Sequence, residues 1–115
     1  MARTKRGKTT NKKRKKVLAG AKGFKWGRKS KYKAAKEALM KAWSYSYRDR
    51  RTKKREMRRH WNIIINNACR KNGMNYRDFI GGLKEKNIEL DRKALCTLAK
   101  QRPETFSKIV EEVKK

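Results

Sequence analysis

The pattern of apolar and polar positions divides the chain into three parts. Residues 1–16 contain only Met1 and Ala2 as apolar residues, so we expect them to be disordered when free. A weak helical turn ending near Gly23 follows. From residue 31 to residue 72 there is neither Pro nor Gly, which predicts one long helix. Beyond it, short apolar stripes alternate with capping residues, and no strand pattern stands out. The predicted fold class is all-α, with a basic disordered or extended N-terminal tail, one long helix and a small C-terminal helical domain.

Two apolar stripes share one side of the predicted long helix. The first comprises Tyr32, Ala35, Leu39, Ala42 and Trp43, and the second comprises Trp61, Ile64, Ile65 and Ala68. Between them Arg50, Lys53 and Lys54 take the apolar positions. We expect Ser30 to cap the start of this helix, and the pair Asn72-Gly73 to end it.

Residues 60–115 predict a small all-α domain, in which the end of the long helix packs against three short helices. Asn75 and Asp91 are the expected N-caps of two of them, and Pro103 fits the first position of the last. The inner residues would be Tyr76, Phe79, Ile80, Leu83, Leu95, Leu98, Ala99, Phe106, Ile109, Val110 and Val113. A domain of this size is marginal but feasible.

The charge distribution separates the first half of the chain from the second. The 115 residues are 36% hydrophobic and 41% charged, with a formal net charge of +27. Residues 1–59 carry +22 of it and residues 60–115 carry +5. Charge on this scale opposes compaction unless a polyanion neutralises it, which points to nucleic acid or an anionic membrane surface. We therefore divide the chain into a basic extension (1–30), a long basic helix (31–59) that is the candidate nucleic-acid-binding part, and the C-terminal domain (60–115).

The charge is densest in Tyr47–Trp61, named here the basic segment, where eight of the fifteen residues are Lys or Arg. On a helix these eight residues spread over roughly two-thirds of the circumference. Asp49, Thr52, Glu56 and His60 share the remaining strip. A helix that is basic nearly all round has no core to face, so it is either solvated or surrounded by something anionic.

The residues offer little for catalysis. There is one histidine and no phosphate-binding loop of known spacing, and we expect no cofactor and no metal site. Cys69 and Cys96 are interpreted as small buried apolar residues in a reducing compartment. A contact with phosphate or with another helix is a better role for His60 than acid–base chemistry. The enzyme interpretation is therefore rejected.

A membrane role is also disfavoured. No apolar run is long enough for a transmembrane helix or a signal peptide. A membrane-active amphipathic helix would need a continuous apolar face, which Arg50, Lys53 and Lys54 interrupt. We therefore expect the protein in the cytoplasm rather than in a membrane.

Aromatic residues lie among the cations and could stack on unpaired bases. Trp26 is expected to stack or insert, because its connector offers little to pack against. Trp43 is expected to pack, because it lies on the apolar stripe, and Tyr47 fits either role. A disordered basic tail with a long basic helix suits folded RNA, while a basic DNA-binding protein of the nucleoid type is the alternative.

Several longer stretches resemble one family. The stretches are MARTKRG, KKVLAGAKGF, YKAAKEALMKAWSYSYRDRR, KKREMRRHW, INNACRKNGMNYRDFIGGLK, IELDRKALCTLA and PETFSKIV. Together they resemble the ribosomal protein L-twenty family of the bacterial large subunit. The resemblance implies a structural protein that binds 23S-type ribosomal RNA directly and is needed early in subunit assembly. It implies a location in the cytoplasm, within the ribosome, with an organellar ribosome left open. It also implies neighbouring large-subunit proteins as partners, and it leaves translational repression through the messenger RNA of its own operon open.

The resemblance also implies which residues face RNA. They are Arg3, Lys5, Arg6, Arg14, Lys15, Lys16, Lys22, Arg48, Arg50, Arg51, Lys54, Arg55, Arg58, Arg59 and Trp61. To these we add Lys25, Trp26, Arg28, Tyr47 and His60 as candidate contacts. In the family, a basic residue of this connector is usually followed directly by Gly. In the connector GFKWGRKS, Trp26 stands between the two, so the RNA contacts near Lys25 to Arg28 are those that the resemblance supports least. The chain also has more asparagines near Trp61 than expected of the family.

Overall fold

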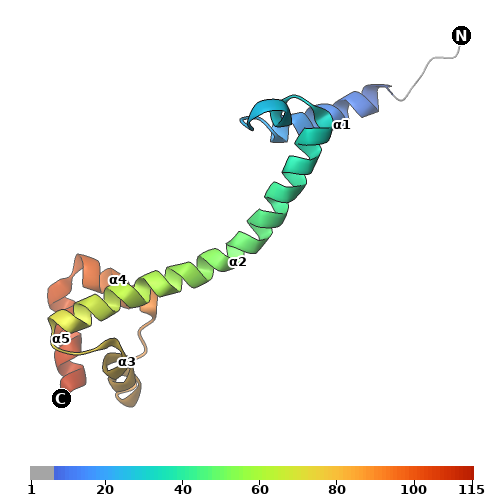
Figure 1. Ribbon diagram of the computed structural model, residues 1–115. Helices are drawn as coiled ribbons and strands as arrows, with labels where there is room; N and C mark the ends of the chain where they lie inside the picture. The colour runs from blue at the N-terminus through green and yellow to red at the C-terminus, as the bar shows by residue number, and fades with distance from the viewer. Residues whose placement is uncertain (1–6) are drawn as a thin grey trace, which may run out of the picture. The chain divides into compact units, whose positions relative to one another are not determined.

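The structure is a computed structural model that describes residues 7–115. In this range the elements are α1 (Gly7–Gly20), a short 3-10 helix η1 (Trp26–Lys29), α2 (Tyr32–Lys71), α3 (Tyr76–Glu85), α4 (Arg92–Gln101) and α5 (Pro103–Lys114) (Figure 1). No strand occurs among these residues, which confirms the all-α prediction. The chain divides into two compact units, Met1–Arg51 and Thr52–Lys115. Within residues 7–115 no helix is both long and apolar enough to cross a membrane.

Helix α2 is the predicted long helix. Its 40 residues correspond to about 60 Å at 1.5 Å per residue. Its first bond runs from the Ala35 N–H to the carbonyl of Lys31 at 2.9 Å, so Lys31 is the N-cap. The expected cap, Ser30, instead ends η1 and donates its N–H to the Gly27 carbonyl. The prediction was wrong by one residue because η1 extends up to the start of α2.

The C-terminal end of α2 is closed by a Schellman motif. The Gly73 N–H donates to the Arg70 carbonyl at 3.0 Å, and the Met74 N–H donates to the Cys69 carbonyl at 3.1 Å. Gly73 has φ +73, the left-handed conformation that this motif requires and that glycine adopts without strain. The Lys114 ammonium also donates to the Asn72 carbonyl. The predicted Asn-Gly stop is thus confirmed.

The predicted caps of the short helices are also in place. The Asn75 side chain accepts from the Asp78 N–H at 2.9 Å, and the Asp91 side chain accepts from the Ala94 N–H at 2.6 Å. Pro103 occupies the first turn of α5. These local signals could be predicted because each cap satisfies backbone groups that the helix itself leaves unpaired.

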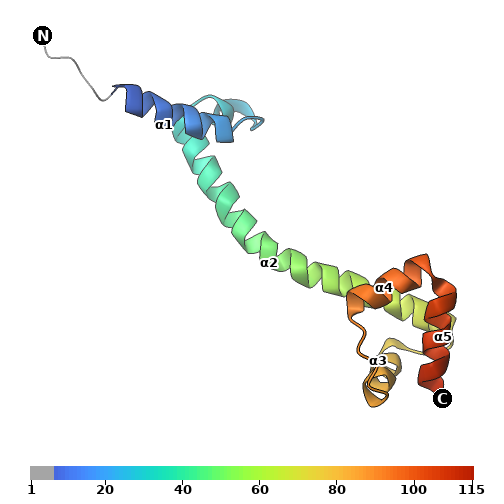
Figure 2. The ribbon, with the colours of Figure 1, turned by 180° about the vertical axis from the view of Figure 1, so that it is seen from behind.

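The second unit has its own hydrophobic core. Both views show α3, α4 and α5 gathered around the last turns of α2 (Figures 1 and 2). The Phe79 and Phe106 rings lie 5.4 Å apart at its centre. The buried residues are Ile65, Cys69, Phe79, Leu83, Leu95, Cys96, Phe106, Val110 and Val113. The remaining predicted inner residues, Tyr76, Ile80, Leu98, Ala99 and Ile109, are partly buried against this core, so the prediction is confirmed.

Both cysteines are free and buried in this core, as predicted. Burial raises the pKa of the Cys69 thiol to about 11. At neutral pH this thiol therefore stays protonated, and it acts as a small apolar side chain.

Polar contacts join α2 to α3 and α4 at the edge of the core. The Tyr76 hydroxyl donates to the Asn62 amide oxygen at 3.0 Å, and the Arg92 Nε donates to the Tyr76 hydroxyl at 3.1 Å. The Tyr76 N–H donates to the Asn66 amide oxygen at 3.3 Å. Asn62 and Asn66, two of the asparagines that exceed the number expected of the family, thus position α3 against α2.

The first unit departs from the expected disordered tail. Residues 7–16 are helical as part of α1, and residues 1–6 lie outside the described residues. Val17 and Leu18 pack against a small buried cluster of Ala21, Ala35 and Leu39. This contact anchors the last turn of α1. From this anchored turn, α1 extends toward its N-terminus through a stretch rich in Lys and Arg, which have good helix propensity. No Gly or Pro interrupts its interior.

Candidate nucleic-acid interface

The basic segment lies within α2 as one uninterrupted stretch of helix. All eight of its Lys and Arg side chains are exposed, and so are Tyr47 and His60. Over residues 43–60 of the described chain no side chain is buried, and Thr52 alone is partly buried. The protein therefore presents this part of the helix to its surroundings on nearly every side.

Few of these cations are neutralised by the protein. Arg48 forms a salt bridge with Asp49 at 2.9 Å, and it is the one cation of the basic segment in a salt bridge among the described residues. The hydrogen bond and charge of Asp49 raise the pKa of Arg48. Exposed pairs of this kind contribute little to stability. The segment therefore keeps most of its positive charge available for an external anion.

Two arginines of the segment lie over tyrosine rings. The Arg48 guanidinium carbon is 4.7 Å from the centre of the Tyr45 ring, and that of Arg51 is 3.9 Å from the centre of the Tyr47 ring. Arg51 Nη1 also donates to the Tyr47 carbonyl at 3.1 Å. These cation–π contacts hold the planar groups of both residues against the helix surface.

The remaining candidate contacts lie on several elements. Arg14, Lys15 and Lys16 are exposed on α1, and the Arg14 guanidinium carbon is 5.6 Å from the centre of the Tyr32 ring. Lys22, Lys25, Trp26 and Arg28 are exposed between α1 and α2. Arg3, Lys5 and Arg6 lie outside the described residues. Trp61 is partly buried against the core of the second unit, so packing accounts for much of its surface.

The aromatic residues differ from expectation at one position. Trp43 was expected to pack, but it is 64% exposed. The buried cluster of the first unit ends at Leu39, one turn earlier, so the apolar stripe continues without a partner among the described residues. Trp26 is 81% exposed, in line with the stacking role expected of it.

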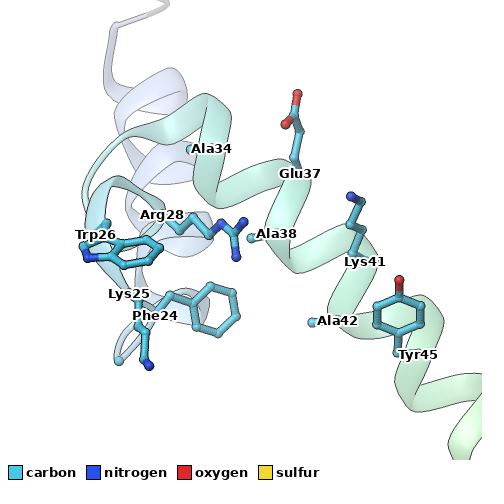
Figure 3. Close-up of a pocket in the computed structure, with 11 residues that line it drawn as sticks. Phe24, Lys25, Trp26, Arg28, Ala34, Glu37, Ala38, Lys41, Ala42 and Tyr45 are labelled. Atoms are coloured by element: carbon cyan, nitrogen blue, oxygen red, sulfur yellow. The ribbon is translucent and has the colours of Figure 1, made fainter.

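A cavity beside the connector was not anticipated from the sequence. It has a volume of about 520 Å³ and lies between the connector residues Phe24, Trp26 and Arg28 and the α2 surface around Ala38 (Figure 3). The aromatic pair Phe24 and Trp26, close together in a short connector, was the one sequence signal that could have indicated it.

Within the described residues no group of His, Cys, Asp or Glu side chains is placed to hold a metal ion. The features that dominate these residues are exposed cations and aromatic rings, which bind phosphates and bases rather than activate a nucleophile.

A family model described as Ribosomal protein L20 matches residues 3–109, which include the whole basic segment. The chain belongs to this family. Membership confirms the resemblance drawn from the sequence stretches, and it confirms that the chain is a non-enzymatic ribosomal protein.

Curated relatives support the same assignment. A protein of Thermomicrobium roseum named "Large ribosomal subunit protein bL20" is 51% identical over 111 residues, covering 96% of this chain and 95% of its own. Proteins of the same name from Acidithiobacillus ferrooxidans and Albidiferax ferrireducens are 51% and 53% identical over 114 residues, covering 99% of this chain and 96% of their own. The similarity thus extends over both units and nearly the full length of each relative.

Proposed function

We propose that this chain is a structural constituent of the large ribosomal subunit, binds 23S-type ribosomal RNA directly and supports early assembly of that subunit. The observation that carries the proposal is the basic segment, whose eight cations are all exposed on a helix that the rest of residues 7–115 leaves uncovered. The names of the relatives support the large subunit as its location.

The distribution of charge indicates the kind of RNA surface that fits. Cations spread over roughly two-thirds of a helix circumference cannot all reach one flat surface. A cleft between RNA helices surrounds the segment and places phosphates on several sides. Phosphates also remove the repulsion between like charges at i, i+4, such as Arg51 and Arg55, which otherwise destabilises the helix. Binding therefore favours the helical state that the structure shows.

The first unit carries further cations of the same kind. The exposed cations of α1 and the connector, from Arg14 to Arg28, have the same phosphate-binding chemistry as the basic segment. α1 carries fourteen residues with no acidic side chain. We propose that it too is stabilised by RNA phosphates.

RNA is preferred over DNA because an irregular folded RNA offers clefts and unpaired bases, and a regular duplex does not. Neighbouring large-subunit proteins are the further partners proposed. Translational repression stays outside the proposal, because nothing in the described residues distinguishes messenger RNA from ribosomal RNA.

A binding competition tests the proposal. The full chain is titrated with large-subunit rRNA, small-subunit rRNA and duplex DNA, at one salt concentration of about 200 mM, where nonspecific phosphate binding is weak. We expect the large-subunit rRNA to bind at least ten-fold more tightly than the other two. Equal affinity for duplex DNA would instead favour the nucleoid-type alternative.

The assembly role is tested separately by reconstitution of large subunits with and without the chain. If the chain is withheld from the first step, we expect the particles to remain incomplete. Adding the chain later should rescue few of them. Complete particles formed at a normal rate without the chain would contradict the assembly role but not RNA binding.

A further inference from the structure

The cavity of the first unit has two unlike walls. One wall is formed by the Phe24 and Trp26 rings of the connector, and the other by the small side chains Ala34, Ala38 and Ala42 of α2 (Figure 3). Its volume of about 520 Å³ lies within the range of about 300–1,000 Å³ typical of small-molecule sites. The cavity is thus large enough for a nucleotide base.

Trp26 is held in an uncommon conformation at the edge of this cavity. Its φ is +54, a left-handed value that is rare for a bulky residue. The residue remains 81% exposed although its side chain is among the most apolar of the unit. Neither the uncommon backbone conformation nor the exposed ring stabilises the free protein. Both features suit a ring that stacks on a ligand.

The charge around the cavity is positive. The Arg28 guanidinium points between the Trp26 ring and the Ala38 side of α2, while the Glu37 carboxylate points away from it (Figure 3). Arg28 has no salt bridge among the described residues. Lys25 and Lys41 add two more cations to the lining. The guanidinium offers only hydrogen-bond donors, so it requires a ligand edge made of acceptors.

We infer that this cavity binds one unpaired guanine of RNA, an inference that rests on the RNA binding proposed above. The base stacks on the Trp26 ring, in the way that aromatic side chains bind unpaired bases. Its O6 and N7 are adjacent acceptors and match the paired donors of Arg28. Adenine presents a donor at the same edge and fits less well. Lys25 and Lys41 lie where they can bind the flanking phosphates.

The test uses three short RNAs of equal charge: a run of about ten uridines, and the same run with one central guanine or one central adenine. Equal length keeps the phosphate contribution constant, so affinity differences report the base alone. Binding to the full chain is measured by fluorescence anisotropy of a labelled RNA. We expect the guanine RNA to bind about ten-fold more tightly than uridine alone and about five-fold more tightly than the adenine RNA.

Two variants separate stacking from edge recognition. Trp26→Gly removes the ring while tolerating the left-handed backbone, and it should abolish both preferences, so that the three RNAs bind equally. Arg28→Met offers no donor to the base edge, so it should abolish the preference for guanine over adenine and keep the preference of both purines over uridine. Trp43→Ala, an exposed tryptophan outside the cavity, and Lys29→Gln, an adjacent cation outside it, should retain the guanine preference.

The inference is overturned if the wild-type chain binds the three RNAs equally, or if Trp26→Gly keeps the guanine preference. Either result leaves the proposed function intact as long as the chain still selects large-subunit rRNA in the competition described above. Loss of that selection would overturn the proposed function, whatever the short RNAs show.

Discussion

Two adjacent stretches of α2 follow different physical rules. In the first stretch, the basic segment up to His60, no side chain is buried, and the exposed surface is mostly Lys and Arg. From Trp61 to Lys71 the same helix buries Ile65 and Cys69 in a core shared with α3, α4 and α5. Both stretches belong to one helix. The stretch from Trp61 to Lys71 is stabilised by packing, whereas the basic segment exposes positive charges whose repulsion is not offset by packing.

The difference assigns stability and RNA affinity to separate stretches of one helix. Stability of the second unit comes from its core, so changes there should alter unfolding without altering phosphate binding. Affinity for RNA should come from the basic segment, so changes there should alter binding without altering the core.

The largest effect on stability is expected for Phe106→Ala. Phe106 is 1% exposed and contacts Phe79 at the centre of the core. The substitution should lower the free energy of unfolding of the second unit by about 3–5 kcal/mol, which is comparable to the whole stability of a small domain. Unfolding can be followed in the full chain through labelling of the two buried thiols of this core, Cys69 and Cys96.

The matched control for this substitution is Ile63→Ala, since Ile63 is 59% exposed on α2 of the same unit. That change should stay within about 0.5 kcal/mol. Equal losses in the two variants would mean that the core does not stabilise the unit as described.

A smaller loss is expected for Gly82→Ala in α3. A Cβ at this position would lie 2.4 Å from Cγ1 of Val113, so α3 and α5 would have to separate. Overpacking of this kind costs about 1–3 kcal/mol. At the neighbouring Gly81 a Cβ meets nothing within 4 Å, and Gly81→Ala should instead stabilise by about 0.5–1 kcal/mol through helix propensity. Chemical denaturation distinguishes the opposite signs.

The smallest of these losses is expected for Tyr76→Phe, which removes a hydroxyl bonded to Asn62 and Arg92. The lost hydrogen bonds should cost about 0.5–1.5 kcal/mol in the same denaturation experiment. Tyr45→Phe, at an exposed position outside this unit, should cost nothing measurable. A Tyr76→Phe variant as stable as the wild type would show that the contacts between α2 and α3 do not depend on this hydroxyl.

Much of the fold could be predicted because its signals are local. Asn75, Asp91 and Gly73 cap helices through groups within a few residues, and the apolar spacing of α3 and α5 follows helix geometry. The structure departs where distant contacts decide the outcome. The helicity of α1 depends on Val17 and Leu18 meeting Ala35 and Leu39 of α2, which no local pattern reveals.

The candidate interface was predictable in composition but not in shape. Cations and their helical spread can be read from the sequence, and all described candidates except Trp61 are exposed. The exposure of Trp43 could not be predicted, because it depends on where the cluster around Leu39 ends. The cavity beside Trp26 required the positive φ of that residue and the path of the connector, neither of which a spacing pattern encodes.

The central claim is that the basic segment is the RNA-binding centre, and one variant tests it most directly. Arg50, Arg51, Lys54, Arg55 and Arg58 are replaced together by Gln, which keeps helix propensity similar and removes five exposed charges. The affinity for large-subunit rRNA is measured over a range of salt concentrations, and Cys69 labelling is measured in parallel. We predict a sharp loss of affinity, a slope of log K against log salt that flattens by about three to four units, and unchanged labelling. Unchanged affinity and slope would contradict the account and assign RNA binding to α1 and the connector instead.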